Sequence, residues 1–205
     1  MKEKLARDFT HIIPNIKGLS EKQLTQHMTL YQGYVKKLNE IEQKLKEVDR
    51  SKANYSFGEY SELMRRRVVP FNGTFLHEVY FDNLEPVGEP EKDITRLLTE
   101  EFGSMDKWKE DMKAAAMSTP GWVLLTWDQT EHKLKHWIMY EHHIGYPVFN
   151  NLVLALDCWE HAFMIDYGID KASYLKTFME NINWEVVNAR FNDILKHSKE
   201  MDISK

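Results

Sequence analysis

The chain has 205 residues, of which 42% are hydrophobic and 29% charged, and its formal net charge is -5. This length and composition are typical of one globular domain or two small lobes. The negative charge argues against a general nucleic-acid binder, which needs a cationic surface. No apolar run approaches the roughly 20 residues of a membrane span, and the N-terminus carries no secretion signal. We therefore expect a cytoplasmic protein that binds neither nucleic acid nor membrane.

The single cysteine and the single basic cluster add little to this picture. Cys158 excludes an internal disulfide, and its position beside Trp159 favours packing over reactivity. We interpret the three arginines at 65–67 as a solvated helix end rather than a nucleic-acid patch. Arginines near a site can also raise the local concentration of a small anion.

The N-terminal part of the chain is predicted to form a helical hairpin. Ser20 begins it with a capping-box signature, because a glutamine follows three residues later. Apolar residues then recur at helical spacing as far as Leu45, which predicts one long amphipathic helix. Its antiparallel partners are expected at 55–69 and 75–84, with a break between them at 70–73 where a proline and a glycine occur.

The C-terminal part is predicted to mix helices with a small sheet. Residues 85–90 contain two prolines and a glycine and are interpreted as a linker between lobes. Aromatic and aliphatic runs at 122–128 and 133–140 flank a polar turn, which indicates a β-hairpin, and the apolar run at 152–157 predicts a third strand. Helices are expected at 93–102, 105–117, 159–167, 171–181 and 184–196.

These elements together predict an α+β fold. Residues 1–88 are expected to form an N-terminal α-helical hairpin domain. Residues 89–205 are expected to form a C-terminal α/β domain with a three-stranded antiparallel sheet.

A carboxylate and an imidazole lie four residues apart where the predicted third strand ends. Asp157 ends this strand and His161 follows in the next helix, so both side chains can reach one metal ion. Two further histidines, His27 and His77, lie inside apolar helical patterns. One buried histidine is more often a hydrogen-bonded core residue than a ligand. Two of them facing Asp157 and His161 favour a metal site between the two domains.

The chain resembles the iron/manganese superoxide dismutases in several motifs. Residues 157–163 read D-C-W-E-H-A-F, which is similar to the D-x-W-E-H-A-Y signature of that family. The likeness extends from His11 to Phe191. It includes F-N-G at 71–73, F-G-S-M-D-K-W-K at 102–109, G-W at 121–122 and I-N-W-E-V-V-N-A-R-F at 182–191.

The resemblance implies a redox metal site and its reaction. One Fe or Mn ion per chain would be held by His27, His77, Asp157 and His161, with a solvent molecule completing the site. Superoxide would be converted into oxygen and hydrogen peroxide as the metal is alternately reduced and reoxidised. The same donors bind both metals, so the sequence leaves iron and manganese open.

The resemblance also implies roles for residues around the metal. His142 is expected to bind the solvent molecule, with its neighbour His143 as the alternative. Tyr34 resembles the family's gateway tyrosine, whose hydroxyl joins the proton network at the substrate entrance. Trp122 and Trp159 are expected to wall the site and keep it dry.

The first helix departs from the family pattern, because only seven residues separate His27 from Tyr34 instead of eight. An ungapped alignment on Tyr34 would make Gln26 the ligand. We favour His27, since seven residues turn about 700°, within about 20° of two full turns, and so keep it on one face with Tyr34. Tyr31 then stands in for the histidine that the family places at its dimer interface, and Met164 replaces the tyrosine opposite.

The resemblance also implies an oligomeric state, and the departures from the family pattern leave two alternative functions. Glu160 is implied to hydrogen-bond a ligand histidine of a second subunit, which predicts a homodimer. Because Tyr31 and Met164 replace the family's residues at the dimer interface, one alternative is a metal-binding homologue with weak or lost dismutase activity. A different metal oxidoreductase on the same scaffold is the other alternative.

Overall fold

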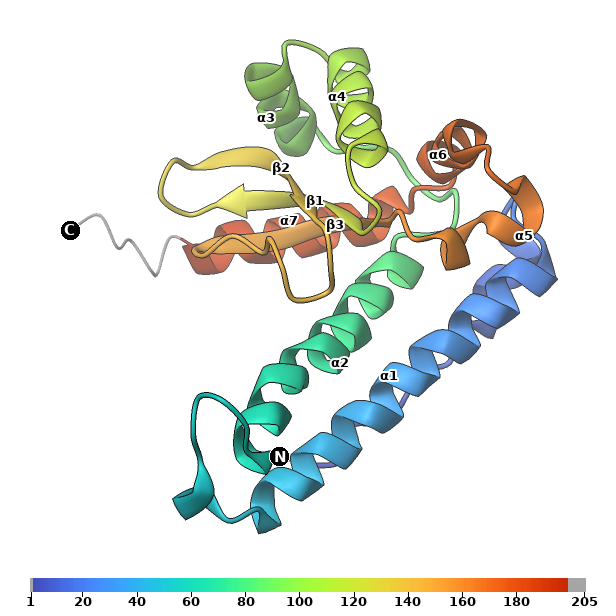
Figure 1. Ribbon diagram of the computed structural model, residues 1–205. Helices are drawn as coiled ribbons and strands as arrows, with labels where there is room; N and C mark the ends of the chain where they lie inside the picture. The colour runs from blue at the N-terminus through green and yellow to red at the C-terminus, as the bar shows by residue number, and fades with distance from the viewer. Residues whose placement is uncertain (1, 199–205) are drawn as a thin grey trace.

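Two long antiparallel helices dominate the N-terminal half of the protein (Figure 1). In the computed structural model, which describes residues 2–198, α1 spans Glu21–Glu47 and α2 spans Glu59–Asp82. The short 3-10 helix η2, Arg50–Lys52, lies in the turn between them. The Ser20 hydroxyl accepts a hydrogen bond from the Gln23 amide at 3.1 Å, as the capping signature predicts. The predicted helical hairpin is confirmed.

Helix α2 is continuous through Pro70, so the predicted break at 70–73 is wrong. A proline inside a helix costs about 3 kcal/mol, which alone would end it there. The next turns carry Leu76, Tyr80 and Phe81, each at most 3% exposed in the core. Burying each of these large side chains contributes about 1.5–3 kcal/mol. Tertiary packing therefore outweighs the local preference for a break.

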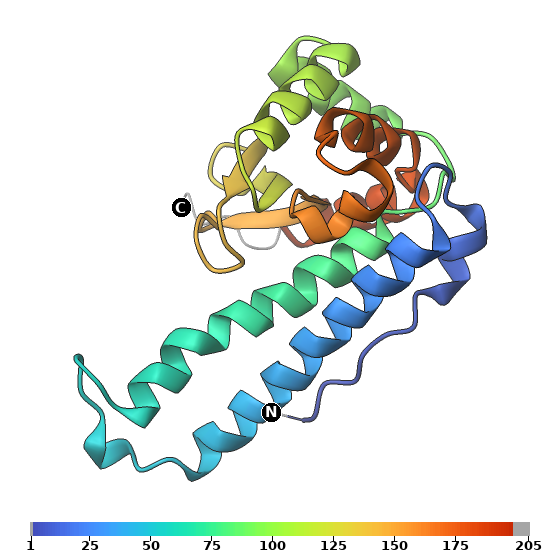
Figure 2. The same ribbon diagram turned by 45° about the vertical axis from the view of Figure 1, so that its right-hand side comes forward.

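The N-terminal segment 2–20 runs back along this hairpin and includes the 3-10 helix η1, Thr10–Asn15 (Figure 2). The Arg7 guanidinium binds both carboxylate oxygens of Asp82 on α2, at 2.6 and 2.8 Å. The Lys4 ammonium donates to Glu78, also on α2, at 3.0 Å. These contacts fix the segment against the two helices.

Residues 85–90 are tied to the C-terminal half rather than forming a free linker. The Glu85 amide donates to the Asn181 carbonyl at 2.9 Å, and the Trp184 amide donates to the Val87 carbonyl at the same distance. The segment therefore joins the end of α2 to the start of the last helix through backbone bonds.

The C-terminal half contains the predicted three-stranded antiparallel sheet, in the order β2-β1-β3. The strands are β1, Trp122–Asp128, β2, Lys133–Met139, and β3, Asn150–Asp157. Helices α3 and α4 contact β2, and helix α7 contacts β3. These helices are confirmed close to their predicted bounds: α3, Lys92–Phe102, α4, Met105–Met117, α6, Lys171–Glu180, and α7, Trp184–Ser198.

The helix predicted at 159–167 is replaced by two short pieces, η3, Glu160–Ala162, and α5, Met164–Tyr167. The side chain of Gln23 explains the interruption. Its amide nitrogen donates to the His161 carbonyl at 2.6 Å, and its amide oxygen accepts from the Ile165 amide at 3.0 Å. In a regular α-helix these two backbone groups would bond to each other. The glutamine amide is inserted between them instead.

One buried core runs through both halves of the molecule, from Phe9 to Phe191. The far end of the hairpin has a small cluster of its own, formed by Ile41, Leu45 and Val48. Within residues 2–198, none of the helices is both long enough and apolar enough to cross a membrane. The metal-ligand candidates lie in the large core, where α1, α2 and the end of β3 meet.

Candidate metal centre

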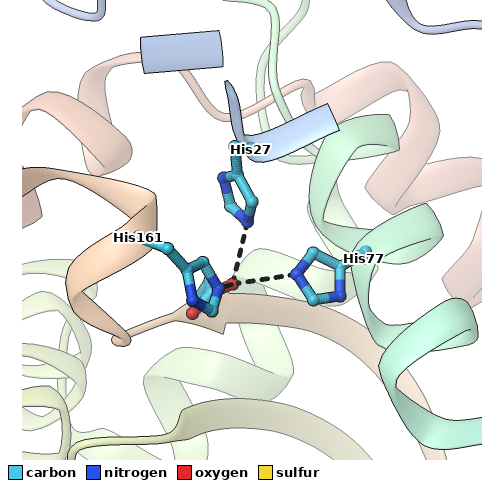
Figure 3. Close-up of side chains that lie close together, drawn as sticks. His27, His77 and His161 are labelled. Atoms are coloured by element: carbon cyan, nitrogen blue, oxygen red, sulfur yellow. Dashed lines mark hydrogen bonds and ion pairs between the residues drawn. The ribbon is translucent and has the colours of Figure 1, made fainter. Parts of the chain in front are cut away.

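Three imidazoles converge on one carboxylate in the core (Figure 3). The Nε2 atoms of His27 on α1 and of His161 in η3 lie 3.1 and 3.0 Å from Asp157 Oδ2. His77 Nε2, from α2, lies 3.5 Å from the same oxygen. One donor atom from each of these four residues lies within 4.8 Å of the other three. The structure thus brings together all four residues that the sequence suggests as ligands.

The arrangement of His77 fits a bound cation. Its Nδ1 donates to the Gly73 carbonyl at 2.5 Å, so its Nε2 presents a lone pair to Asp157 Oδ2 and has no hydrogen-bond partner within residues 2–198. Two facing lone pairs in a buried site are unfavourable unless a cation lies between them. Metal–nitrogen bonds of about 2.1 Å at angles of 90–120° separate donor atoms by roughly 3.0–3.6 Å. The contacts of 3.0–3.5 Å match this range.

The electrostatics of the site keep His27 and His77 neutral and Asp157 ionised, while attraction to Asp157 outweighs burial and raises the pKa of His161. Burial lowers the pKa of His27 and, further, that of His77, because desolvation penalises an imidazolium. Burial alone would favour the neutral acid of Asp157, but attraction to His161 and His27 brings its pKa well below the ordinary value. Neutral imidazoles with one carboxylate form a donor set that suits Fe and Mn.

Two further side chains hold the ligands in place, and the sequence did not reveal either. The Gln23 amide described above fixes the backbone of His161. The Tyr174 hydroxyl donates to the Asp157 carbonyl at 2.7 Å. The capping pattern had already explained Gln23, and Tyr174 lies in an ordinary amphipathic helix, so no local signal identified them. The Asp157 Oδ1 atom in addition accepts from the Trp159 amide at 2.9 Å.

A hydrogen-bonded chain leads from Trp122 through His142 to Tyr34. Trp122 Nε1 donates to His142 Nδ1 at 2.9 Å, and His142 Nε2 lies 2.6 Å from the Tyr34 hydroxyl oxygen. Because the indole can only donate, a neutral His142 carries its proton on Nε2 and donates it to Tyr34. Burial lowers the pKa of His142 to about 4 and raises that of Tyr34 to about 12. Both groups are therefore neutral near pH 7.

His143 does not share this position, because it lines a separate surface groove with Phe75 and Tyr146. The structure therefore places His142, and not His143, beside Tyr34. Gln26 is exposed, whereas His27 is 1% exposed and lies in the ligand cluster.

Tyr34 is seated against Gly73 of α2. A Cβ atom at this glycine would lie 2.8 Å from Tyr34 Cδ1 and 2.9 Å from Cγ, which is closer than real Cβ contacts allow. The Tyr34 ring centroid lies 5.3 Å from that of His77. The absent side chain at Gly73 therefore lets Tyr34 approach the ligand.

The two predicted tryptophans lie against ligand imidazoles, while Glu160 lies apart. The Trp122 ring meets the His77 ring edge-on at 5.1 Å, and the Trp159 ring is nearly parallel to that of His161 at 6.3 Å. Glu160 is exposed and hydrogen-bonds no other site residue in the described part of the chain.

Tyr31 does not lie at a free surface, so its interpretation as an interfacial residue is wrong. Its side chain is 0% exposed, and its hydroxyl accepts from the Arg7 amide at 2.9 Å and donates to Glu78 Oε1 at 2.8 Å. The N-terminal segment covers this face of α1. Tyr31 therefore cannot contact a second subunit.

Comparisons with known proteins agree with this geometry. Residues 90–190 match the family described as "Iron/manganese superoxide dismutases, C-terminal domain". The chain is 36% identical over 193 residues to the superoxide dismutase [Fe] of Aquifex pyrophilus, covering 91% of each protein. It is 35% identical over 182 residues to the superoxide dismutase [Fe] of Cupriavidus metallidurans, covering 85% of this chain and 89% of the relative.

A manganese enzyme is similar to nearly the same extent. The superoxide dismutase [Mn] 2 of Haloferax volcanii is 32% identical over 181 residues, covering 87% of this chain and 89% of the relative. These matches extend over nearly the whole chain. The chain belongs to the iron/manganese superoxide dismutases.

Proposed function

We propose that the protein converts superoxide into oxygen and hydrogen peroxide at a site where His27, His77, Asp157 and His161 hold one iron or manganese ion. The observation that carries this proposal is the convergence of three imidazole nitrogens on one buried carboxylate oxygen at 3.0–3.5 Å. When bound, the metal supplies an acceptor for one electron and a donor of the same electron to the next substrate. Relatives named for iron and for manganese support either ion.

The protein's own residues supply the protons that hydrogen peroxide requires. His142 donates its Nε2 proton to the Tyr34 oxygen, so the hydroxyl proton of Tyr34 remains free to point to a bound anion or solvent molecule. Trp122 holds His142 in the tautomer that allows this. Trp122 and Trp159 cover the ligand imidazoles with apolar rings and limit the entry of water.

Metal content and activity, measured together, test the proposed function. Purified protein loaded with iron or manganese is expected to hold one ion per chain and to dismutate superoxide rapidly. Bound metal with little or no dismutation would contradict the proposal and favour the metal-binding homologue. The cytoplasmic location and a domain boundary between residues 88 and 89 remain predictions.

Trp122→Phe is expected to move the acid limb of the pH profile to higher pH. In the wild type, burial lowers the pKa of His142 to about 4, and a second proton on Nδ1 would in addition face the Trp122 N–H. Without the indole N–H this repulsion is removed while the burial remains, so the pKa should rise part of the way toward the ordinary value of about 6.5. We expect kcat/KM to be constant from pH 5 to 8 in the wild type and to begin its acid-side decline at a higher pH in the variant.

Trp127→Phe is the matched control for this measurement. Trp127 lies on the same strand and is also buried, but its Nε1 has no hydrogen-bond partner within residues 2–198. Its replacement should leave the profile flat. Equal profiles for Trp122→Phe and the wild type would show that the indole does not set the protonation of His142.

We further propose a homodimer in which Glu160 reaches His161 of the second subunit. Glu160 borders a surface depression of about 760 Å³ that is partly lined by exposed apolar side chains, such as Met164 and Ile169. Such an apolar surface around a charged residue is typical of a protein interface. The His161 side chain is itself 24% exposed at this face.

Glu160→Ala is expected to weaken metal retention by about 10-fold to 100-fold, the usual effect of removing a partner of a ligand histidine. Sedimentation of the wild type should give twice the mass of the 24.4 kDa chain. Glu180→Ala, at an exposed acid 3.8 Å from Lys176 on α6, should leave metal retention unchanged. A monomeric wild type, or equal metal retention in both variants, would refute the bridging role.

A further inference from the structure

A surface groove between α1 and α2 leads to Tyr34. It has a volume of about 580 Å³, and Tyr34, Gly33 and Lys37 line its α1 side. Arg66 and Pro70 line its α2 side. The groove therefore reaches Tyr34, which is hydrogen-bonded to His142 at 2.6 Å and packs beside His77.

The charges of the arginine cluster are distributed unequally along this groove. Arg65 pairs with Glu62 at 2.7 Å, and Arg67 pairs with Glu42 at 2.5 Å. Arg66 is exposed, lines the groove and forms no ion pair with any carboxylate in the described residues. The other cation of the groove, Lys37, pairs with Glu40 at 2.5 Å. Arg66 is thus the cation whose charge faces the groove without a neutralising partner.

The distance from Arg66 to the site is short enough for its charge to matter. Arg66 precedes Gly73, against which Tyr34 packs, by seven residues of α2. Seven residues correspond to about 10 Å along a helix. The screening length is about 8 Å at physiological ionic strength and about 30 Å at 0.01 M. The attraction between Arg66 and an anion near Tyr34 should therefore be strong at low salt and largely screened at high salt.

The chain as a whole carries a net charge of -5, so a local cation at the groove offsets the repulsion that an anion would otherwise meet. The substrate is a monoanion, so the overall field of the protein repels it. Positive charge at the mouth of a cleft raises the local concentration of an anion and its association rate. Electrostatic steering of this kind acts on association rather than on dissociation.

We propose that Arg66 guides superoxide, and small anions in general, through the α1/α2 groove to Tyr34 and the metal centre. For superoxide, this role rests on the proposed function. Arg66 touches none of the reacting atoms; it acts by raising the rate at which the anion arrives.

Variants of Arg66 in the metal-loaded enzyme test the proposal. At 10 mM salt we expect kcat/KM for superoxide to fall about threefold in Arg66→Gln and about tenfold in Arg66→Glu, since charge reversal doubles the electrostatic change. The difference should nearly vanish at 300 mM salt, where the screening length is shorter than the distance involved. In Arg66→Glu the rate should rise with salt, whereas in the wild type it should fall.

Arg65→Gln is the matched control, because it removes the same charge from the next residue of the same helix. Arg65 does not line the groove, so its variant should stay within about 1.5-fold of the wild type. Equal losses in Arg65→Gln and Arg66→Gln would reduce the effect to net charge and overturn the proposal. A loss in Arg66→Gln that does not change with salt would overturn it as well.

Azide binding separates this proposal from the proposed function. Stopped-flow mixing of azide with the iron-loaded protein should give a slower association rate in Arg66→Gln and an unchanged dissociation rate. Slower azide association without any dismutase activity in the wild type would support the groove and contradict the proposed function. Normal dismutation with equal azide association in all variants would support the function and contradict the role of Arg66.

Discussion

His27→Ala should release the metal and abolish dismutation, whereas Gln26→Ala should retain both. His27 Nε2 lies 3.1 Å from Asp157 Oδ2 in the buried cluster, and Gln26 is exposed on the neighbouring face of α1. Four-ligand zinc sites bind with about 10–16 kcal/mol, or about 2.5–4 kcal/mol per ligand. Loss of one ligand should therefore weaken binding on the order of 10²-fold to 10³-fold.

Metal analysis after dialysis against a weak chelator measures this difference directly. His27→Ala should lose its metal, and Gln26→Ala should retain one ion per chain. Circular dichroism of both variants checks that the helical hairpin is intact. Metal retained in His27→Ala but lost in Gln26→Ala would show that the ligand assignment in α1 is off by one residue.

Gly73→Ala is expected to lower activity strongly with only a small change in stability. The added Cβ would lie 2.8 Å from Tyr34 Cδ1, so the ring must move away from Gly73 and leave its present position beside His77. Overpacking of this kind costs about 1–3 kcal/mol, and the gain in helix propensity returns about 1 kcal/mol. A displacement of about 1 Å in a positioned catalytic group can cost up to about 100-fold in rate. We therefore expect kcat/KM to fall by about tenfold or more.

Gly33→Ala provides the comparison, since Gly33 is next to Tyr34 in α1 and a Cβ atom added there would meet no other atom within 4 Å. This variant should be more stable by about 0.5–1 kcal/mol and should keep its activity. Urea unfolding and kcat/KM, measured on both variants, distinguish the two effects. Full activity in Gly73→Ala would mean that Tyr34 tolerates the displacement and that its close seat is not needed.

Hydrophobic periodicity was sufficient to predict most elements of the fold. The strands came out at their predicted positions because alternating or continuous apolar runs bounded by turns leave few alternatives. The errors occurred where a contact distant in sequence outweighed a local signal. Packing on α1 carries α2 through Pro70, and the amide of Gln23 splits the helix that should follow Asp157. Neither contact is visible in a local window of sequence.

The ligand residues could be suggested from the sequence because a metal site restricts residue types and spacing. The residues that hold these ligands in place could not be predicted from the sequence. Tyr174 and Gln23 bind backbone groups, which any suitably placed polar side chain can do, so they leave no characteristic pattern. Tyr31 was misassigned because the position of a residue in a motif does not show which segment covers it. Here residues 2–20 cover that face of α1, and their path depends on tertiary contacts with Asp82 and Glu78.

The position of Gln23, one helical turn before His27, makes α1 responsible for two ligands at once. The helix carries His27 itself and, through the amide of Gln23, fixes the backbone from which His161 projects. A rotation of this end of α1 about its axis would misplace both imidazoles together. The contacts of Gln23 and His27 therefore fix the orientation of the helix before the chain reaches Tyr34. The shortened spacing follows this anchored turn. A residue lost between His27 and Tyr34 therefore changes the position of Tyr34 and leaves the metal ligands in place.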